Sequence, residues 1–356
     1  MTAMRRVVVY PGRIAVEAAD IPAPGPNEAL VRTLAVGVCG SDLHAAHGRH
    51  PFVPLPYRPG HEVVGVIEAA GAAAGAAGAA AGAAGAAAGA VPGQRVIVEP
   101  DLPCWTCKMC TSGRENLCEN LQFFGCGYAQ GGMADYFTLA VNRQHPVPDA
   151  LDDHTAALIE PLSTPVHAVR LAGDVAGRSV AILGAGTIGL FTLAVLRAHG
   201  AGKVVSTDPN LAKRQRAEAL GADVTIDARS PDVTGQVREA LGGSADIVFD
   251  CVAIQSSVDQ AIAIADKGGT VMVVGVPAAA VTVPLPIVQD HQIRIQGSAT
   301  YLPPDYAESA DLLRRGAVRA ADFVTATRPL AQVAEAFELA SSGQHVKVLV
   351  TVGERS

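Results

Sequence analysis

The sequence predicts an α/β protein of two domains, in which a doubly wound parallel sheet is joined to a β-rich domain. The chain has 356 residues, of which 49% are hydrophobic and 17% charged, enough for two buried cores. Between residues 156 and 296, short apolar strands alternate with helical stretches, the pattern of a parallel sheet. Before residue 156 the short apolar runs are broken by proline and glycine instead, which is typical of strands joined by turns.

The β-rich part begins near the N-terminus. Residues 5–36 alternate between apolar and polar and are punctuated by prolines and a glycine around residues 22–26. Residues 63–68 and 95–99 are predicted to form two further strands. From Gly297 the chain is expected to return to this domain, with helices near 305–315 and 331–341 and a strand at 346–352. We therefore expect one discontinuous domain, 1–155 with 297–356, and one continuous domain, 156–296.

Between the strands at 63–68 and 95–99 lies a segment, Ala69 to Ala90, in which every residue is alanine or glycine. Its glycines are spaced 4, 3, 4, 3 and 4, so a helix would place them on one closely packing face. Each helical glycine costs about 1 kcal/mol relative to alanine, however. No large apolar side chain is present to dock such a helix. We expect a solvated loop inserted at a hairpin tip, where added length costs little closure entropy.

A cluster of four cysteines follows, within a lobe at about residues 100–120: Cys104, Cys107, Cys110 and Cys118. Four thiolates at this spacing fill a tetrahedral zinc shell and leave no position for water or substrate, so the site would be structural. Four free thiols and an iron–sulfur cluster are the alternatives. Cys126 and Cys251 have no partner spacing and are expected to pack as small hydrophobic side chains.

A second group of potential metal donors is dispersed along the chain. Cys39 begins the stretch Cys-Gly-Ser-Asp-Leu-His, His61 and Glu62 follow Gly60, and Glu160 precedes Pro161. Catalytic zinc is typically held by three protein ligands with a fourth position open. Here one thiolate, one imidazole and one carboxylate are available from separate segments.

The second domain carries a glycine-rich loop, Gly184-Ala-Gly186-Thr187-Ile188-Gly189, between a strand at 179–184 and a helix at 187–199. The next strand, 203–207, ends in Asp208, and further strands are predicted at 224–227, 246–250, 270–274 and 292–296. This combination predicts a dinucleotide site. The glycines let the backbone approach a pyrophosphate, the helix N-terminus offers amide donors, and the acid accepts hydrogen bonds from ribose hydroxyls. Asp208 would repel a 2′-phosphate, so we expect NAD and not NADP, and we interpret Lys213 and Arg214 as charges on a solvated helix face.

In this order, these motifs resemble the zinc-dependent medium-chain alcohol dehydrogenases, over nearly the whole chain. Glu160-Pro-Leu stands where the liver-type enzymes carry a cysteine, so the chain looks closest to the polyol, butanediol and threonine dehydrogenase branch. The resemblance implies a Rossmann domain at 156–296 and a GroES-like catalytic domain. It also implies two zinc ions per chain, one catalytic and one structural, and hydride transfer between an alcohol and NAD.

The resemblance also implies residue roles. Ser41 and His44 match the hydroxyl and imidazole that pass the alcohol proton to solvent. Glu62 would ligate zinc directly, through water, or in exchange with substrate, or it would be a solvated carboxylate beside the zinc ligands. Asp42 would orient a zinc-bound histidine. Gly275 and Val276 would lie beside the nicotinamide. Four residues fall near substrate-pocket positions of the family: Phe52, Phe124, Thr300 and Tyr301. The sorbitol-type pattern has arginine where Thr300 stands, so a secondary alcohol or vicinal diol is expected before a sugar polyol.

Charge and targeting signals restrict the partners. The net charge of −7 and the lack of a dense basic run argue against nucleic acid or an acidic membrane surface. The N-terminal apolar run is broken at once by Pro11-Gly12, unlike a signal or transit peptide, so we expect a cytoplasmic protein. We expect a homo-oligomer, with a tetramer favoured over a dimer, whose partner is a small alcohol or ketone.

Two other readings remain. Zinc-free reductases of the same superfamily act on quinones or activated double bonds, but they lack the Cys39, His61 and Glu160 set and the four-cysteine lobe. A non-catalytic NAD-binding protein on the same fold would not need Ser41 beside the metal.

Overall fold

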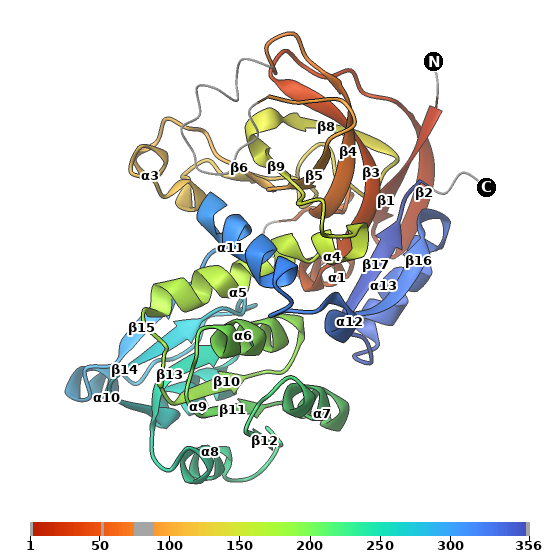
Figure 1. The fold of residues 1–356 in the computed structure, drawn as a ribbon. Helices are drawn as coiled ribbons and strands as arrows, with labels where there is room; N and C mark the ends of the chain where they lie inside the picture. The colour runs from red at the N-terminus through yellow and green to blue at the C-terminus, as the bar shows by residue number, and fades with distance from the viewer. Residues whose placement is uncertain (1–2, 51–52, 75–88, 354–356) are drawn as a thin grey trace. The chain divides into compact units, whose positions relative to one another are not determined.

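The computed structural model describes residues 3–50, 53–74 and 89–353. Contacts divide the chain into two compact units, Met1–Ser163 with Tyr301–Ser356, and Thr164–Thr300. The first unit is rich in strands and the second alternates strands with helices, which confirms the α/β class (Figure 1).

A seven-stranded sheet organises the first unit. Its central strand is β3 (Glu28–Val38), which pairs antiparallel with β4, β8 and β17. The main path of the sheet runs β16-β17-β3-β4-β5-β9, and two small sheets, β1-β2 and β6-β7, complete the unit. The remaining bounds are β1 Ala3–Tyr10, β2 Arg13–Asp20, β4 Glu62–Ala70, β5 Arg95–Val98, β6 Asp101–Leu102, β7 Gln122–Phe123, β8 Tyr136–Ala140, β9 Gln144–Pro146, β16 Val324–Pro329 and β17 Lys347–Thr351.

The core of this unit is built from the β-branched residues of these strands. Val31 and Val36 of β3, Val63 of β4 and Val348 of β17 are all buried in one apolar cluster. β-Branched side chains suit a pleated sheet, so the valine-rich sequence and the observed strands agree. The expected strands at 63–68, 95–99 and 346–352 correspond to β4, β5 and β17.

The Ala/Gly segment joins β4 and β5, which pair antiparallel as a hairpin. After β4 the segment hydrogen-bonds to the start of β3 and the turn that precedes it: the Gly71 amide donates to the Glu28 carbonyl at 2.9 Å and the Ala73 amide to the Pro26 carbonyl at 2.8 Å. A Cβ atom on Gly71 would lie 1.9 Å from the Gly25 carbonyl oxygen, so glycine is required there. Of the loop predicted at 69–90, residues 75–88 lie outside the described residues.

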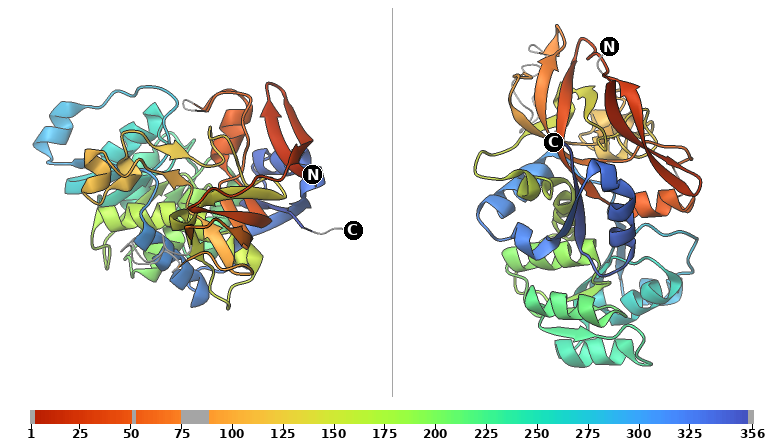
Figure 2. Two further views of the ribbon diagram at one scale, coloured as in Figure 1. Left: turned by 90° about the horizontal axis from the view of Figure 1, so that it is seen from above. Right: turned by 90° about the vertical axis from the view of Figure 1, so that its right-hand side faces the viewer.

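Short helices and the chain ends complete the first unit. In Figure 2 the red N-terminal hairpin β1-β2 lies beside the blue C-terminal segment, where α13 contacts β2 and α1. The helical bounds in this unit are α1 Gly40–Ala46, α3 Lys108–Thr111, η1 Glu115–Leu117, η2 Val141–Arg143, α4 Asp153–Ala156, α11 Pro303–Arg314, α12 Ala320–Phe323, η3 Leu330–Gln332 and α13 Val333–Ser341. A further helix, α5 (Ile159–Ala172), continues from this unit into the second.

The second unit contains a six-stranded parallel sheet in the order β12-β11-β10-β13-β14-β15. This order reverses beside β10, so the sheet is doubly wound as predicted, and ligands of such sheets bind at the carboxyl ends of the strands near that reversal. The strands are β10 Val180–Leu183, β11 Val204–Thr207, β12 Val224–Ile226, β13 Ala245–Asp250, β14 Ala265–Val273 and β15 Arg294–Gly297.

Five helices accompany this sheet in the described chain, α6 packing with α7 and α8 with α9. Their bounds are α6 Thr187–Ala198, α7 Leu211–Ala219, α8 Val233–Leu241, α9 Gln255–Ile264 and α10 Leu285–Asp290. Among the described residues, no helix has the length and apolar character needed to cross a membrane.

Candidate active site

Cys39 stands at the start of helix α1, where an extended backbone (φ −95°, ψ 157°) leads out of β3. Asp42 fixes this corner, because its carboxylate accepts a hydrogen bond from the Cys39 amide at 3.0 Å. The Tyr57 hydroxyl donates to the same carboxylate at 3.2 Å. Asp42 is fully buried, and burial raises the pKa of its carboxyl.

Ser41 and His44 lie on α1, three residues apart, and therefore project from one face of the helix. Ser41 is half-buried and His44 is exposed. A hydroxyl near Cys39 and an imidazole in contact with solvent are thus carried by the same short helix.

His61 and Glu62 are placed where the chain enters β4, and both are buried. One donor atom from each of Cys39, His61 and Glu62 lies within 4.8 Å of the others, a spacing that a single metal ion can span. His61 Nδ1 is buried and has no hydrogen-bond partner within the described part of the chain. Burial lowers the pKa of His61, but the charge of Asp42 and the neighbouring Cys39 outweigh it and raise the pKa well above its usual value.

Two glycines beside these donors leave no room for a side chain. A Cβ atom on Gly37 would lie 1.7 Å from Glu62 Oε2, so only glycine leaves room for the carboxylate. Gly60, just before His61, has φ +105°, and a Cβ there would lie 2.4 Å from the Met133 amide nitrogen. The backbone around both donors is therefore tightly constrained.

Lys347, which sequence reasoning missed, pairs with Glu62. Its ammonium group in β17 lies 2.6 and 2.8 Å from the two Glu62 oxygens and 3.3 Å from the Val38 carbonyl, and the side chain is only 3% exposed. Burial lowers the pKa of Lys347, but the Glu62 carboxylate outweighs it, so the pKa is raised. A single lysine in the otherwise apolar run 346–352 was the signal available in the sequence.

Glu160 approaches from the first turn of α5 and is held by a tyrosine. The Tyr301 hydroxyl donates to Glu160 Oε1 at 2.5 Å, and both side chains are buried. Burial raises the pKa of Glu160 to about 7 and also raises the pKa of Tyr301, which therefore stays protonated as the donor. Glu160 lies close enough to His61 for their charges to interact, but it is not one of the three groups with donors within 4.8 Å.

Two of the four expected pocket residues are buried in the structure. Phe124 has no exposed surface and packs against Phe137, with ring centroids 5.0 Å apart, so it belongs to the core. Tyr301 is 2% exposed and packs edge-on against Tyr306, so it supports Glu160 and does not form an open wall. Thr300 is half-buried with a left-handed backbone (φ 44°), and Phe52 lies outside the described residues.

The four cysteines of the lobe come together as a second donor cluster. Their sulfur atoms lie within 4.8 Å of one another, with 3.5 Å between Cys107 and Cys110 and 3.9 Å between Cys107 and Cys118. Sulfurs placed about 2.3 Å from a tetrahedral zinc would be about 3.8 Å apart, so this spacing fits the metal. None of the four is in a disulfide. The Thr106 hydroxyl, donating to the Cys104 sulfur, lowers the pKa of Cys104 to about 5, which favours a thiolate.

The glycine-rich loop connects β10 to α6 in the second unit. Gly184 has φ +94°, Gly186 precedes the first residue of α6, and a Cβ on Gly189 would lie 1.8 Å from the Gly184 carbonyl oxygen. Thr187 and Ile188 begin the helix, whose N-terminal amides point toward the loop. Gly275 follows β14, where a Cβ would lie 2.8 Å from the Val252 backbone, and Val276 is 69% exposed.

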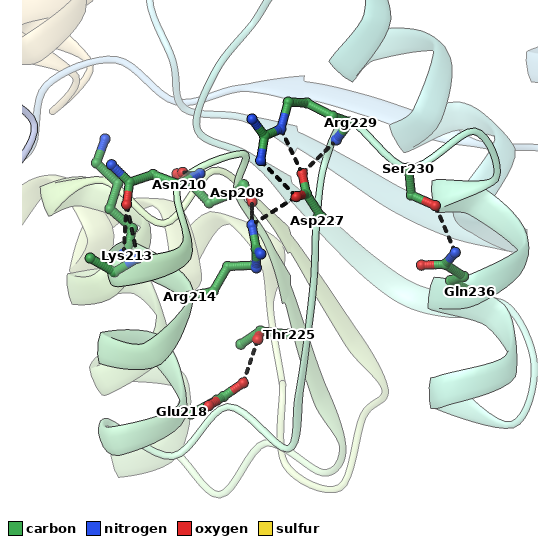
Figure 3. A network of polar contacts seen from close by, with 11 residues as sticks. Asp208, Asn210, Lys213, Arg214, Glu218, Thr225, Asp227, Arg229, Ser230 and Gln236 are labelled. Atoms are coloured by element: carbon green, nitrogen blue, oxygen red, sulfur yellow. Dashed lines mark hydrogen bonds and ion pairs between the residues drawn. The ribbon is translucent and has the colours of Figure 1, made fainter.

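Asp208 faces this loop from the end of β11. Its carboxylate accepts hydrogen bonds from the amides of Ala185 at 2.9 Å and Asn210 at 2.8 Å. Arg214 was expected on a solvated face, and this expectation is wrong: its guanidinium is only 14% exposed and donates to the Asp208 carbonyl at 2.7 Å (Figure 3).

Comparisons with known proteins agree with this arrangement. Residues 25–149 match the family described as "Alcohol dehydrogenase GroES-like domain" and residues 187–315 match "Zinc-binding dehydrogenase". The chain is 33% identical to sorbitol dehydrogenase of Gallus gallus over 350 residues, covering 97% of this chain and 95% of that protein.

Two solved structures are similar over almost the full length. A zinc-binding dehydrogenase from Sinorhizobium meliloti 1021 bound to NADP has a TM-score of 0.88 and 32% identity, covering 99% of this chain and 100% of that one. The 2R,3R-butanediol dehydrogenase from Bacillus subtilis has a TM-score of 0.86 and 25% identity, covering 98% and 100%. The expected GroES-like and Rossmann-type architecture is confirmed.

Proposed function

Because the chain belongs to the zinc-dependent medium-chain alcohol dehydrogenase superfamily, and is therefore an oxidoreductase acting on CH–OH groups, we propose that it oxidises a secondary alcohol, vicinal diol or polyol. The reverse reaction would reduce the matching ketone, and NAD(H) would carry the hydride. The observation that carries this proposal is the convergence of thiol, imidazole and carboxylate donors from the half-buried Cys39 and the buried His61 and Glu62. The polyol and butanediol dehydrogenases among the relatives support the substrate class.

A catalytic zinc fits this set of residues. Cys39, His61, Glu62 and Glu160 would hold it. The buried His61 Nδ1, which has no hydrogen-bond partner among the described residues, supports a role for this ring as a ligand. When bound, zinc supplies a Lewis acid that polarises the alcohol oxygen and eases loss of its proton. Asp42, buried beside His61, would orient the imidazole.

The chain's own groups would then hold and move the proton. The Ser41 hydroxyl would accept the alcohol proton, and His44, on the same face of α1 and exposed, would pass it to solvent. Glu62, which accepts hydrogen bonds from Lys347, would either bind metal or withdraw toward the ammonium group. Thr300, together with Phe52, would remain as candidate substrate contacts.

The four-cysteine lobe would hold a second, structural zinc, giving two per chain. The sulfur spacing and the closed set of four thiols support this assignment, because no position is left for substrate. Its contribution would be to the stability of the lobe.

The second unit would bind NAD through Gly184, Gly186, Thr187, Ile188 and Gly189, with Asp208 on the adenosine ribose and Gly275 and Val276 near the nicotinamide. The buried Asp208 carboxylate against the loop supports this orientation. Residues 156–296 would form the nucleotide domain and 1–155 with 297–356 the catalytic domain. The division of contacts after Ser163 and after Thr300 supports these limits.

The assembly and compartment are also proposals. The edge strand β15 exposes Ile295, and α10 exposes Leu285 and Ile287, an apolar surface that favours a homo-oligomer, with a tetramer preferred to a dimer on family grounds. A cytoplasmic location agrees with seven cysteines outside disulfides.

A scan of alcohols for NADH formation tests this function. Secondary alcohols and vicinal diols should yield NADH, and NAD should be preferred to NADP by at least about a hundredfold in kcat/KM, since like-charge discrimination amounts to several kcal/mol. The scan should be repeated after removal and restoration of zinc. Reduction of quinones or activated double bonds without zinc would favour the zinc-free reductase, and no turnover with any class would favour a non-catalytic nucleotide-binding protein.

A further inference from the structure

A pair of arginines and a second aspartate lie at the strand ends beside Asp208. Asp227 follows β12, the neighbour of β11 in the sheet, and Figure 3 shows its carboxylate between the side chains of Arg214 and Arg229. We call Asp227, Arg214 and Arg229 the strand-end cluster. Sequence analysis assigned it no function.

Asp227 contacts the guanidinium groups of both arginines in the cluster. Arg229 binds it through Nη2 at 2.8 Å and Nε at 3.1 Å, and the Arg229 amide also donates at 2.9 Å. Arg214 Nη1 lies 3.4 Å from Asp227 Oδ2, the oxygen that also accepts from Arg229 Nη2. The hydrogen bonds from Arg229 lower the pKa of Asp227, which therefore remains an anion at neutral pH.

The cluster adjoins the place where the adenosine ribose would bind. Arg214 touches both acids, donating to the Asp208 carbonyl at 2.7 Å while it approaches Asp227. The Asp208 carboxylate in turn accepts from the Ala185 amide of the glycine-rich loop. Two guanidinium groups therefore lie at the edge where a dinucleotide with a phosphate on its ribose would present that phosphate.

Guanidinium groups are well suited to bind phosphate, because their planar array of donors can make two parallel hydrogen bonds to it. Here, however, the charges of the four groups cancel: Asp208 and Asp227 are negative, Arg214 and Arg229 positive. Without the Asp227 charge the same edge would carry a net positive charge and two arginines with free donors.

We propose that Asp227 is a specificity-determining residue, which occupies Arg214 and Arg229 and so prevents this edge from binding the 2′-phosphate of NADP. The inference rests on the proposed function, since it assumes a nucleotide at the glycine-rich loop. Selection against NADP then has two parts: Asp208 repels the phosphate directly, and Asp227 removes the cations that would offset that repulsion.

Binding of two nucleotide fragments separates these parts without requiring zinc or turnover. Adenosine 2′,5′-bisphosphate and adenosine 5′-monophosphate would be titrated by calorimetry into the wild type, Asp208→Ser, Asp227→Asn and the double variant. In the Asp208→Ser background, adding Asp227→Asn should tighten binding of the bisphosphate at least about tenfold, or about 1.4 kcal/mol. Binding of the monophosphate should change by less than about threefold, under 1 kcal/mol.

Three further variants make the result specific. Asp227→Glu keeps the charge and should retain the selectivity of the wild type. Adding Arg229→Met to the double variant should abolish the gain, because one of the released cations is lost. Asp311→Asn is a matched control: Asp311 on α11 in the other unit also bridges two arginines, at 2.6 and 3.4 Å, and its loss should leave the ratio of the two affinities unchanged.

The outcomes are distinguishable. Equal bisphosphate affinity in Asp208→Ser and in the double variant would overturn the role of Asp227 and leave the nucleotide assignment intact. The same conclusion would follow if the gain in bisphosphate affinity remained after Arg229→Met. Failure of the wild type to bind the monophosphate would overturn this inference together with the nucleotide assignment on which it rests.

Discussion

At the scale of single residues, the candidate active site depends on two supporting contacts, those of Lys347 with Glu62 and of Tyr301 with Glu160. Each brings a charged or hydrogen-bonding group to a buried carboxylate that would otherwise lack solvation. The two carboxylates therefore differ: Glu62 is paired with a cation and Glu160 with a neutral donor.

Replacing Tyr301 with phenylalanine should lower kcat/KM by about 10- to 100-fold, the usual effect of losing a group that orients a metal ligand. The ring packing would remain while the hydrogen bond to Glu160 is lost. The absorption spectrum of the cobalt-substituted protein should shift as well, since it reports the ligand geometry.

Tyr306→Phe is the matched control for this change, because the Tyr306 hydroxyl donates to the Val98 carbonyl at 3.1 Å and not to Glu160. It should affect stability more than the cobalt spectrum. Unchanged activity and an unchanged spectrum in Tyr301→Phe would mean that Glu160 needs no such support.

Replacing Lys347 with methionine should lower the free energy of unfolding of the metal-free protein by about 3–5 kcal/mol, because it leaves the buried Glu62 charge unpaired. Urea denaturation measures this loss. The double variant Lys347→Met with Glu62→Gln should recover part of it, since no uncompensated charge remains. A loss below about 1 kcal/mol in the single variant would contradict the buried ion pair, as that is the range of exposed pairs.

At the scale of elements, the Ala/Gly segment is expected to be dispensable. Replacing residues 75–88 with a short glycine-containing turn should change kcat/KM by less than about threefold, under 1 kcal/mol. The residues up to Ala74 should be kept, because Gly71 and Ala73 hydrogen-bond to the turn at 26–28 and Ala74 is buried. A larger loss of activity, or a different oligomeric state by light scattering, would indicate that the repeat packs against the protein.

Elements with a strong periodicity of apolar residues could be predicted from the sequence, whereas elements with a weak periodicity could not. The expected strands and helices of the nucleotide domain agree with the structure to within a few residues, except that β14 begins earlier, at Ala265. Strand β16 was missed because its sequence, Val-Thr-Ala-Thr-Arg-Pro, is only partly buried and has little apolar alternation. Its partner β17, a run of valine and leucine, was recognised.

The sequence could likewise predict only part of the candidate active site. Donors in short motifs, such as Cys39 and His61, could be proposed from neighbouring residues. Lys347 and Tyr301 could not be given their roles, because Lys347 is 285 residues from Glu62 in sequence and Tyr301 is 141 residues from Glu160. Only the folded chain brings these pairs together.

At the scale of the whole molecule, a continuous series of contacts links the four-cysteine lobe to the candidate active site within the first unit. The Arg143 guanidinium lies 5.0 Å from the centre of the Trp105 ring in the lobe and 2.7 Å from Glu99, which also binds His145 at 2.5 Å. The series ends with three rings in contact: His145 stacks on Tyr306, and Tyr306 packs edge-on against Tyr301, which donates to Glu160. The lobe is thus connected to the residues that support Glu160, a candidate active-site carboxylate, although its own cysteines belong to a separate cluster.

The central claim is that an open zinc site at Cys39 performs the chemistry, while the closed four-cysteine site supports the fold. The most direct test is the rate of NADH formation by Cys39→Ala, measured beside Cys110→Ala and with zinc content determined for each. The wild type should contain about two zinc ions per chain, one in each kind of site. Cys39→Ala should remain folded, lose one zinc and show no turnover, and Cys110→Ala should chiefly lose stability. Full activity in a folded Cys39→Ala, or only one zinc in the wild type, would contradict the claim.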